Sequence, residues 1–318
     1  MKPGATTYEG HARTLVALTL LRAGGPEERA TAKKLLDEWW LDAVAGRFGD
    51  ATQPGTYGTY VVALGISALD ALTLEPIEDD TSTLTRYARK PPGDDLKKRL
   101  EIATKALVDS SYSDGAWGYH VRSFKDRGGG SSSTYDLSNT QFAALALHDA
   151  ARAGVTIPTE NVEGIVRYVA RQADEDPKAA AGKAPARLRW SYKLESGTRS
   201  VPAMTYAALS ILAVARSLGA KDERLEPTIA GGLVDLSKLV KTVGPATEGE
   251  HGFGNAYVLY SLEKALDLLE IEELDGKDWF APIAERVLKT QNSSGLYGGG
   301  DLIDSCLYVL FLQREADG

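Results

Sequence analysis

The feature that most constrains the fold is a segment that recurs six times along the chain. Each copy is a turn rich in small or aromatic residues, followed directly by an apolar stretch rich in Ala and Leu. The copies span residues 6–24, 55–72, 135–151, 199–215, 251–266 and 298–312. We take as equivalent positions Thr14, Tyr60, Thr140, Thr205, Ala256 and Ser305. The basic period is about fifty residues, with two longer steps, which predicts a repeat architecture.

The longer steps contain segments that are typical of loops. Residues 78–95, 124–134 and 174–187 are dominated by Pro, Gly, Ser and charged residues. Such segments cannot bury much apolar surface, so we expect them to lie outside the packed core.

A second set of helices is expected between the six segments, at residues 26–45, 95–110, 159–173, 225–240 and 277–291. Their apolar residues recur at three- and four-residue spacing with charges between them, which predicts one exposed face. The first set is apolar nearly all round and should be buried on all sides. Together they predict an all-α fold without strands: an (α/α)6 toroid of six inner and about six outer helices, as one domain over residues 1–318.

In such a toroid the inner helices begin at one common rim. Asp136, Ser138 and Asn139 stand at the start of the third apolar segment, and their short side chains suit an N-terminal cap. Converging N-termini would bring the positive ends of the helix dipoles together at a central mouth. We therefore expect a ligand with an anionic group at that end.

Charge and composition narrow the partners. The formal net charge is −8, so no nucleic-acid partner is expected, because a phosphate-binding surface needs clustered Lys and Arg. The single cysteine, Cys306, excludes an intramolecular disulfide. No apolar run approaches the roughly 18 residues of a membrane span. The first residues do not have the pattern of a signal peptide.

Two stretches resemble the QW repeats of squalene-hopene and oxidosqualene cyclases. In residues 287–299, Gln291, Gly295 and Tyr297 fit the pattern, with Tyr in place of Trp. In residues 107–120, Gly115 and Trp117 fit, with Ser111 where Gln is expected; residues 189–193 are a weaker echo. The physical role of such a loop is to join neighbouring repeats by packing an aromatic ring and closing a helix end.

The whole chain is similar to bacterial prenyltransferase/squalene-oxidase repeat proteins, chiefly through residues 135–147 and 304–314. The resemblance implies a terpenoid-cyclase-like or prenyltransferase-like toroid over the entire chain. Because similar proteins often carry signal peptides, it also implies an exported protein whose signal peptide is absent from this chain.

The family's chemistry does not carry over completely. In class II terpene cyclases a DxDDT-type motif protonates an alkene; here Asp136 and Thr140 match its ends, but Ser138 and Asn139 replace the middle acids. A hydroxyl cannot protonate an alkene, so class II cyclisation is not expected. Residues 77–82 are too short for the Asp-rich metal motif of class I enzymes and are interpreted as surface charge.

Protein prenyltransferases bind zinc through an Asp-x-Cys pair and a later His. Asp304 and Cys306 match the pair, and His11 or His251 could supply the imidazole. The competing interpretation is that Asp304 caps a helix and Cys306 is a small buried apolar residue. We expect the latter, and hence no metal or other cofactor.

The leading hypothesis is a toroid that binds a small apolar or isoprenoid-like ligand in a central aromatic-lined cavity. The candidate ligand-binding residues are Tyr57, Tyr60, Trp117, Tyr119, Asn139, Trp190, Tyr192, His251 and Tyr257. Packing between repeats is the alternative role for each aromatic residue. His148, late in an inner helix, is expected to be a packed core residue or a helix-end residue.

Two other functions stay open. One is a divergent enzyme, a prenyltransferase, a cyclase or a carbohydrate-active toroid, that uses Asp136 and Asp304, with Glu9, as paired carboxylates. The other is a scaffold that binds another protein through an apolar rim. The sequence identifies neither a substrate nor an oligomeric state.

Overall fold

The computed structural model describes residues 8–44, 58–77, 86–119, 121, 135–174, 187–192, 200–241, 255–297 and 301–314. These residues are mostly helical, which confirms the all-α class. The prediction of no strands is wrong in two places, where short antiparallel hairpins form. They are β1 (Leu74–Ile77) with β2 (Arg86–Arg89), and β3 (Glu273–Leu274) with β4 (Lys277–Asp278).

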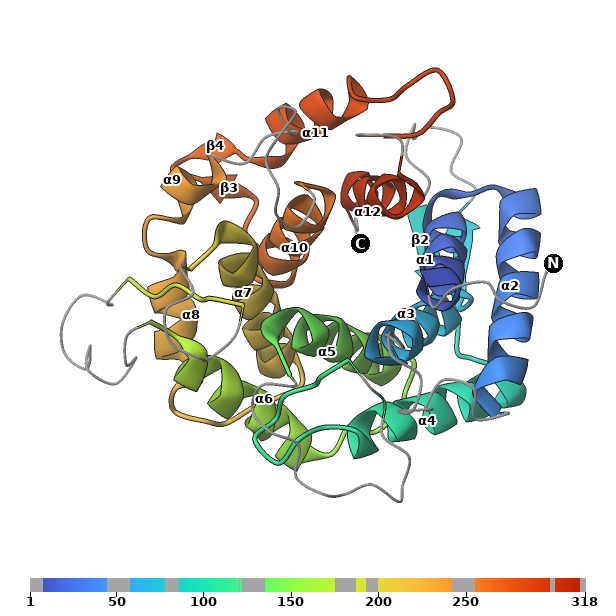
Figure 1. Cartoon of the computed structure of the whole chain (residues 1–318), viewed down its shortest axis with the longest axis horizontal. Coiled ribbons are helices and arrows are strands. Elements are labelled where there is room, and N and C mark those ends of the chain that lie inside the picture. The colour runs from blue at the N-terminus through green and yellow to red at the C-terminus, as the bar shows by residue number, and fades with distance from the viewer. Residues whose placement is uncertain are drawn as a thin grey trace.

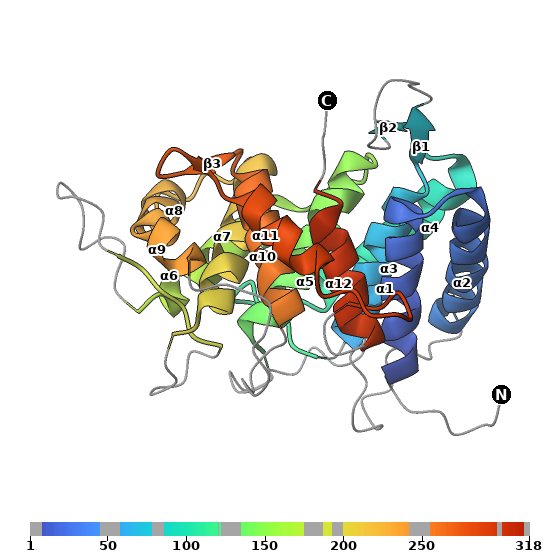
Figure 2. The ribbon, with the colours of Figure 1, turned by 90° about the horizontal axis from the view of Figure 1, so that it is seen from above.

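Six helices fall in the six recurrent segments, as predicted. They are α1 (Tyr8–Ala23), α3 (Gly58–Ala71), α5 (Leu137–Arg152), α7 (Pro202–Ser217), α10 (Asn255–Leu268) and α12 (Leu302–Leu312). We call them the inner helices. Each contacts the next in this order, and α12 contacts α1, so the contacts return to their starting point (Figure 1). Both hairpins follow the C-terminal end of an inner helix, α3 or α10, and Figure 2 shows them at the same end of the molecule.

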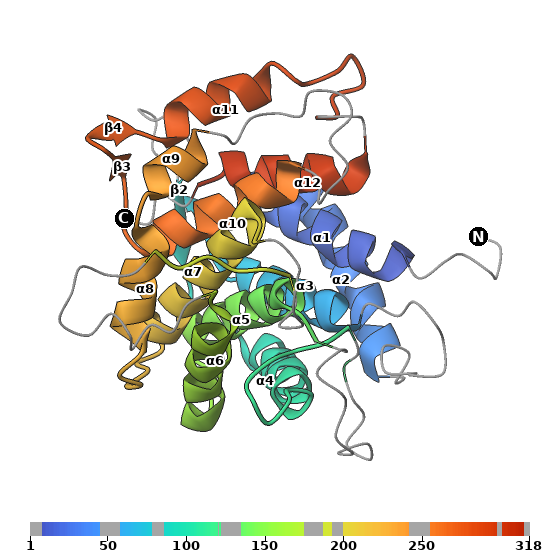
Figure 3. The same cartoon turned by 60° about the vertical axis from the view of Figure 1, so that its left-hand side comes forward.

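The remaining helices lie outside the inner ones (Figures 1 and 3). They are α2 (Pro26–Val44), α4 (Asp94–Asp109), α6 (Thr159–Gln172), α8 (Leu225–Leu233), α9 (Leu236–Val240) and α11 (Phe280–Leu288). The single helix predicted for residues 225–240 is broken, because Asp235 takes a left-handed conformation with φ 58°. Within the described part of the chain, no helix has the length and apolar character needed to cross a membrane.

Aromatic side chains fill the middle of the inner helices. The Phe142 ring of α5 lies 4.9 Å from the Tyr60 ring of α3, measured between centroids. It also stacks on Tyr257 and Tyr260 of α10, at 6.1 and 5.7 Å. Because α3 and α10 are not neighbours in the circuit, Phe142 reaches across the axis. Aromatic rings therefore occupy the space between α3, α5 and α10 at this level.

A buried glutamine ties three inner helices together beside these rings. The Gln141 amide donates to Ser210 Oγ on α7 (3.0 Å). Its carbonyl oxygen accepts from Tyr257 OH (2.7 Å) and Ser261 Oγ (3.2 Å) on α10. Each polar atom of this side chain has a partner, so the network fixes the relative register of α5, α7 and α10.

Candidate functional site

Asp136 is the N-cap of α5, as predicted, and its side chain is fully buried. Oδ1 accepts from the Asn139 backbone N–H (2.8 Å) and from Ser138 Oγ (2.8 Å). Oδ2 accepts from Asn139 Nδ2 (2.8 Å). Both carboxylate oxygens thus accept hydrogen bonds from the first turn of α5. These bonds are sufficient to explain why the carboxylate can be buried.

The start of α12 repeats this cap with Asp301, not Asp304, in the place of Asp136. Asp301 Oδ1 accepts from the backbone N–H groups of Ile303 (2.8 Å) and Asp304 (3.1 Å). The expectation that Asp304 caps the helix is therefore wrong. Asp304 is half-buried, and its burial, with the nearby Asp301 carboxylate, raises its pKa. Among the described residues, no hydrogen bond or electrostatic interaction joins Asp304 to Asp136.

The same correspondence extends to the loops that resemble QW repeats. Trp117 N donates to Thr140 Oγ1 (3.1 Å), as Tyr297 N donates to Ser305 Oγ (3.0 Å). Gly115 and Gly295 occupy the same left-handed position, with φ of 87° and 81°. The two loops are thus one structural device used twice, and the predicted equivalence of Thr140 and Ser305 is confirmed.

Trp117 and Trp190 lie in the core instead of lining a cavity. Both are fully buried. The Trp117 indole N–H donates to Leu107 O in the last turn of α4 (2.8 Å), and the Trp190 indole donates to Val169 O in the last turn of α6 (2.9 Å). They close the ends of outer helices, so for these two candidate ligand residues the structure supports the packing role.

Three predicted ligand residues do meet above the start of α5. Tyr60 OH lies 2.7 Å from Ser138 Oγ, and Tyr192 OH lies 3.4 Å from the same atom. The Tyr119 and Tyr192 hydroxyls are hydrogen-bonded to each other. Burial, and next the Asp136 carboxylate, raise the pKa of Tyr60 and Tyr192. These hydroxyls stay protonated and act as hydrogen-bonding groups, not as bases.

The remaining candidates divide between core and undescribed positions. Asn139 is fully buried beside Asp136, and Tyr257 is buried in the aromatic centre. Tyr57 and His251 lie outside the described residues, as do the side chains of His11 and Glu9.

The zinc interpretation gains no support. Cys306 is buried, as expected, and burial raises the pKa of its thiol, with an opposing effect of Thr19 on α1. A raised pKa disfavours the thiolate that zinc binds. Within the ranges that the structure describes, no three His, Cys, Asp or Glu side chains are grouped as a metal site.

A pocket opens at the opposite end of the inner helices, towards their C-termini. The pocket is a partly open hollow, and the space between its lining atoms, solvent at the mouth included, is about 590 Å³. Five of the six inner helices supply its lining, which comprises Leu18, Arg22, Ser67, Leu145, His148, Asp149, Arg152, Tyr260, Lys264, Asp267, Leu268, Leu310 and Gln313. The sequence predicted the site at the N-terminal mouth, so the structure places the open pocket at the other end of the aromatic centre.

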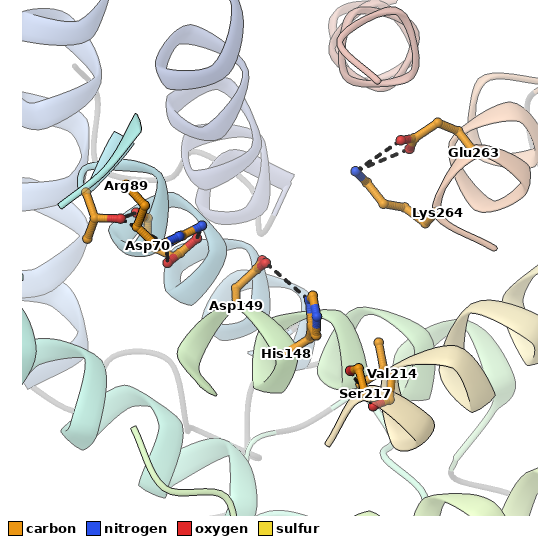
Figure 4. A network of polar contacts seen from close by, with 9 residues as sticks. Asp70, Arg89, His148, Asp149, Val214, Ser217, Glu263 and Lys264 are labelled. Carbon is orange, nitrogen blue, oxygen red and sulfur yellow. Dashed lines mark hydrogen bonds and ion pairs between the residues drawn. The ribbon is translucent and has the colours of Figure 1, made fainter. Parts of the chain in front are cut away.

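Charged side chains from several elements surround this pocket (Figure 4). Lys264 extends from α10 and pairs with the buried Glu263 (3.2 Å). On α5, His148 Nδ1 lies 3.9 Å from Asp149 Oδ1. The sequence predicted a packed core residue or a helix-end residue at His148; the structure places it near the end of α5, in the lining of the pocket.

Asp70, near the C-terminal end of α3, is a fully buried carboxylate close to this pocket. Arg89 reaches it from β2 and donates to both oxygens, with Nη2 3.1 Å from Oδ2. Burial, and next the Asp149 carboxylate, raise the pKa of Asp70 to about 6 against the opposing effect of Arg89. The hairpin thus supplies the cation that a buried carboxylate on α3 requires.

The sequence contains a signal for this pocket that the predictions above did not use. Leu145, His148, Asp149 and Arg152 follow one another at three-, one- and three-residue spacing, on one face of α5. The face starts apolar and ends charged, on a helix otherwise buried on all sides. A charged stripe late in a buried helix indicates a solvent-filled space at that end.

Comparison with known proteins adds no relative. No protein-family model matches the chain, and a search of curated proteins found none that is similar to it. The likeness to cyclase and prenyltransferase repeats therefore depends on the residues quoted above.

Proposed function

We propose that the chain is an (α/α)6 toroid of the terpenoid-cyclase and prenyltransferase type that binds a small apolar ligand without cyclising it. The contacts that run from α1 through the inner helices to α12 and back to α1 support this architecture. So do the two equivalent loops that begin α5 and α12, because a repeated junction is what a ring of repeats requires.

The single observation that carries the binding function is the convergence of five inner helices on one open pocket. Leucines from four of them, Leu18, Leu145, Leu268 and Leu310, lie around it, and Tyr260 adds an aromatic wall. A concave site with apolar walls and a few polar groups is the usual form of a small-molecule site.

The state of Asp136 argues against a cyclase. A proton donor for an alkene must present an acidic hydrogen to the substrate. Asp136 accepts three hydrogen bonds from Ser138 and Asn139 within its own helix start. Its neighbour Ser138, at the position where class II cyclases have their acid, offers only a hydroxyl.

The test is binding of farnesol, followed by isothermal calorimetry, to the wild type and to a variant with a blocked pocket. Gln313→Trp suits this purpose, because Gln313 lines the pocket yet is exposed, so a larger ring enters the mouth without disturbing the core. We expect farnesol to bind the wild type and to bind Gln313→Trp at least about tenfold more weakly, a loss of roughly 1.4 kcal/mol.

Arg216→Trp is the matched control, since Arg216 is exposed near the C-terminal end of α7 and does not line the pocket. It should bind farnesol like the wild type. Equal weakening in both variants, or no binding to the wild type, would refute the proposal.

A further inference from the structure

Three cationic side chains from three different inner helices line the pocket. Arg22 lies in the last turn of α1, Arg152 in the last turn of α5, and Lys264 on α10. Basic residues in a last helical turn complement the helix dipole, which explains a single arginine but not the convergence of three cations on one space.

The two acids of the lining have cationic or ionisable neighbours of their own. Asp267 Oδ1 lies 3.6 Å from Nε of Arg314, a residue outside the pocket lining. Asp149 lies beside His148. The cations of the lining thus outnumber its acids, three to two; outside the lining Arg314 faces Asp267 and the buried Glu263 faces Lys264, which leaves the excess of one positive charge unchanged.

Tyr260 marks the point where these charges meet. Lys264 Nζ lies 5.9 Å from the centre of its ring. Burial raises the pKa of the Tyr260 hydroxyl; of the nearby charges Lys264 and Arg22 lower it, and the Asp149 and Glu263 carboxylates raise it. The charged groups of three helices are therefore within electrostatic reach of one buried hydroxyl, directly beside the apolar walls of the pocket.

We propose that the pocket selects an amphipathic anion: a molecule whose apolar part lies against the leucines and whose anionic head lies among Arg22, Arg152 and Lys264. This rests on the proposed function, since it names the class of ligand for the same site. It also reverses the expectation from the helix dipoles, which put an anionic group at the N-terminal mouth. At the C-terminal end the helix dipoles are negative, so the positive charge for such a head comes from the cationic side chains themselves.

Four small probes separate the head from the tail. Octyl phosphate carries both, 1-octanol has the tail alone, inorganic phosphate has the charge alone, and octylamine carries the opposite charge. Calorimetry at low ionic strength should give octyl phosphate an affinity at least about tenfold above 1-octanol, with octylamine weaker than 1-octanol. The advantage of octyl phosphate should shrink as NaCl is raised, because salt screens a partly exposed ionic contact.

Two variants locate the head. Arg152→Gln and Arg22→Gln should each lower the affinity for octyl phosphate about threefold to tenfold and leave that for 1-octanol unchanged. Lys264 is spared, because its removal would break an ion pair of the buried Glu263. Arg216→Gln, on α7 and outside the pocket, is the matched control and should bind all four probes like the wild type. Circular dichroism and thermal melts establish that each variant is folded.

The outcomes are distinct. Equal binding of octyl phosphate and 1-octanol overturns the anion preference and leaves the apolar pocket standing. Tighter binding of octylamine overturns the sign of the charge. Inorganic phosphate that binds as tightly as octyl phosphate overturns the role of the tail. If neither 1-octanol nor octyl phosphate binds, both this inference and the proposed function fail.

Discussion

Asp136 and Asp301 make the same cap in two repeats but in different surroundings. Asp136 is fully buried, whereas Asp301 is exposed. The same mutation at the two positions therefore distinguishes two effects on stability. One is the stabilisation that any helix cap provides, and the other is the cost of leaving buried hydrogen-bond donors without an acceptor.

We expect Asp136→Ala to destabilise the protein far more than Asp301→Ala. Loss of the Asp136 carboxylate leaves the backbone N–H and the side-chain amide of Asn139 without their acceptor in a buried place, at about 1–3 kcal/mol each. Loss of the exposed Asp301 cap costs about 1 kcal/mol. Urea unfolding of both variants should show a difference of at least about 2 kcal/mol.

Similar losses in the two variants would contradict this account. Asp136→Asn is a useful companion, because its amide oxygen can still accept from the Asn139 backbone. It should recover part of the stability that Asp136→Ala loses.

At the scale of single residues, the sequence predicted which roles occur, such as a helix cap or a buried thiol, better than it predicted which residue performs each role. The cap at Asp136 and the burial of Cys306 follow from short polar and small apolar residues at helix starts. Asp301 and Asp304 are close together after a Gly-rich approach, and nothing local decides which one begins the helix. The pocket residues escaped notice because charged residues at a helix end usually face solvent.

At the scale of elements, the loops before α5 and α12 share their hydrogen bonds but not their packing. Gly115 lies against Gly164 of α6, where an added Cβ would come within 2.0 Å of the Gly164 carbonyl carbon. An added Cβ at Gly295 would meet nothing within 4 Å. Both glycines have positive φ, so backbone strain is common to the two positions.

We therefore expect Gly115→Ala to cost more stability than Gly295→Ala. The strain of the left-handed conformation costs about 1–2 kcal/mol at either position. At Gly115 the loop must also move away from α6, which should bring the total above about 4 kcal/mol, in the range of severe core mutations. Thermal or urea unfolding measures both, and equal losses would show that the loop does not depend on α6.

Hydrophobic periodicity predicted the helices well, because inner and outer helices differ in how much of their surface is apolar. The breaks were less visible. Asp235 divides α8 from α9 because its own backbone is left-handed. An aspartate can also stand inside a helix, so the residue type did not reveal the break. Strand β2 falls in a segment predicted as a loop. Its residue Arg89 is held by hydrogen bonds to Asp70 and Thr73, which precede the hairpin and are not part of the local sequence of the strand.

At the scale of the whole molecule, the closing contact between α1 and α12 is the least predictable from sequence. Both helices are rich in apolar residues, as the other inner helices are, so composition does not say whether the last one returns to the first. Packing decides it: α1 and α12 are in contact, and the side chain of Thr19 on α1 lies near the Cys306 thiol on α12. An open superhelical stack of the same repeats would hold these two side chains far apart.

This contact provides a direct test of closure, because Cys306 is the only cysteine of the chain. In the variant Thr19→Cys the two sulfurs would come from side chains that lie near each other, so mild oxidation should join the introduced thiol to Cys306 in a disulfide. The bond would connect two helices at opposite ends of the sequence and stabilise the protein by about 2–5 kcal/mol, chiefly by restricting the unfolded chain. A rise of at least about 5 °C in the melting temperature, reversed by dithiothreitol, should accompany it.

The wild type under the same oxidation is the control, since one thiol cannot form an intramolecular disulfide and its melting temperature should not change. Mass spectrometry of the two peptides that carry the introduced cysteine and Cys306 identifies the bond, and gel mobility without reductant distinguishes it from a covalent dimer. Two free thiols after oxidation, or dimers alone, would mean that α1 and α12 do not meet. The pocket would then lose the helices that carry Arg22 and Leu310 from its wall, and the ligand proposed for it would have no enclosed site.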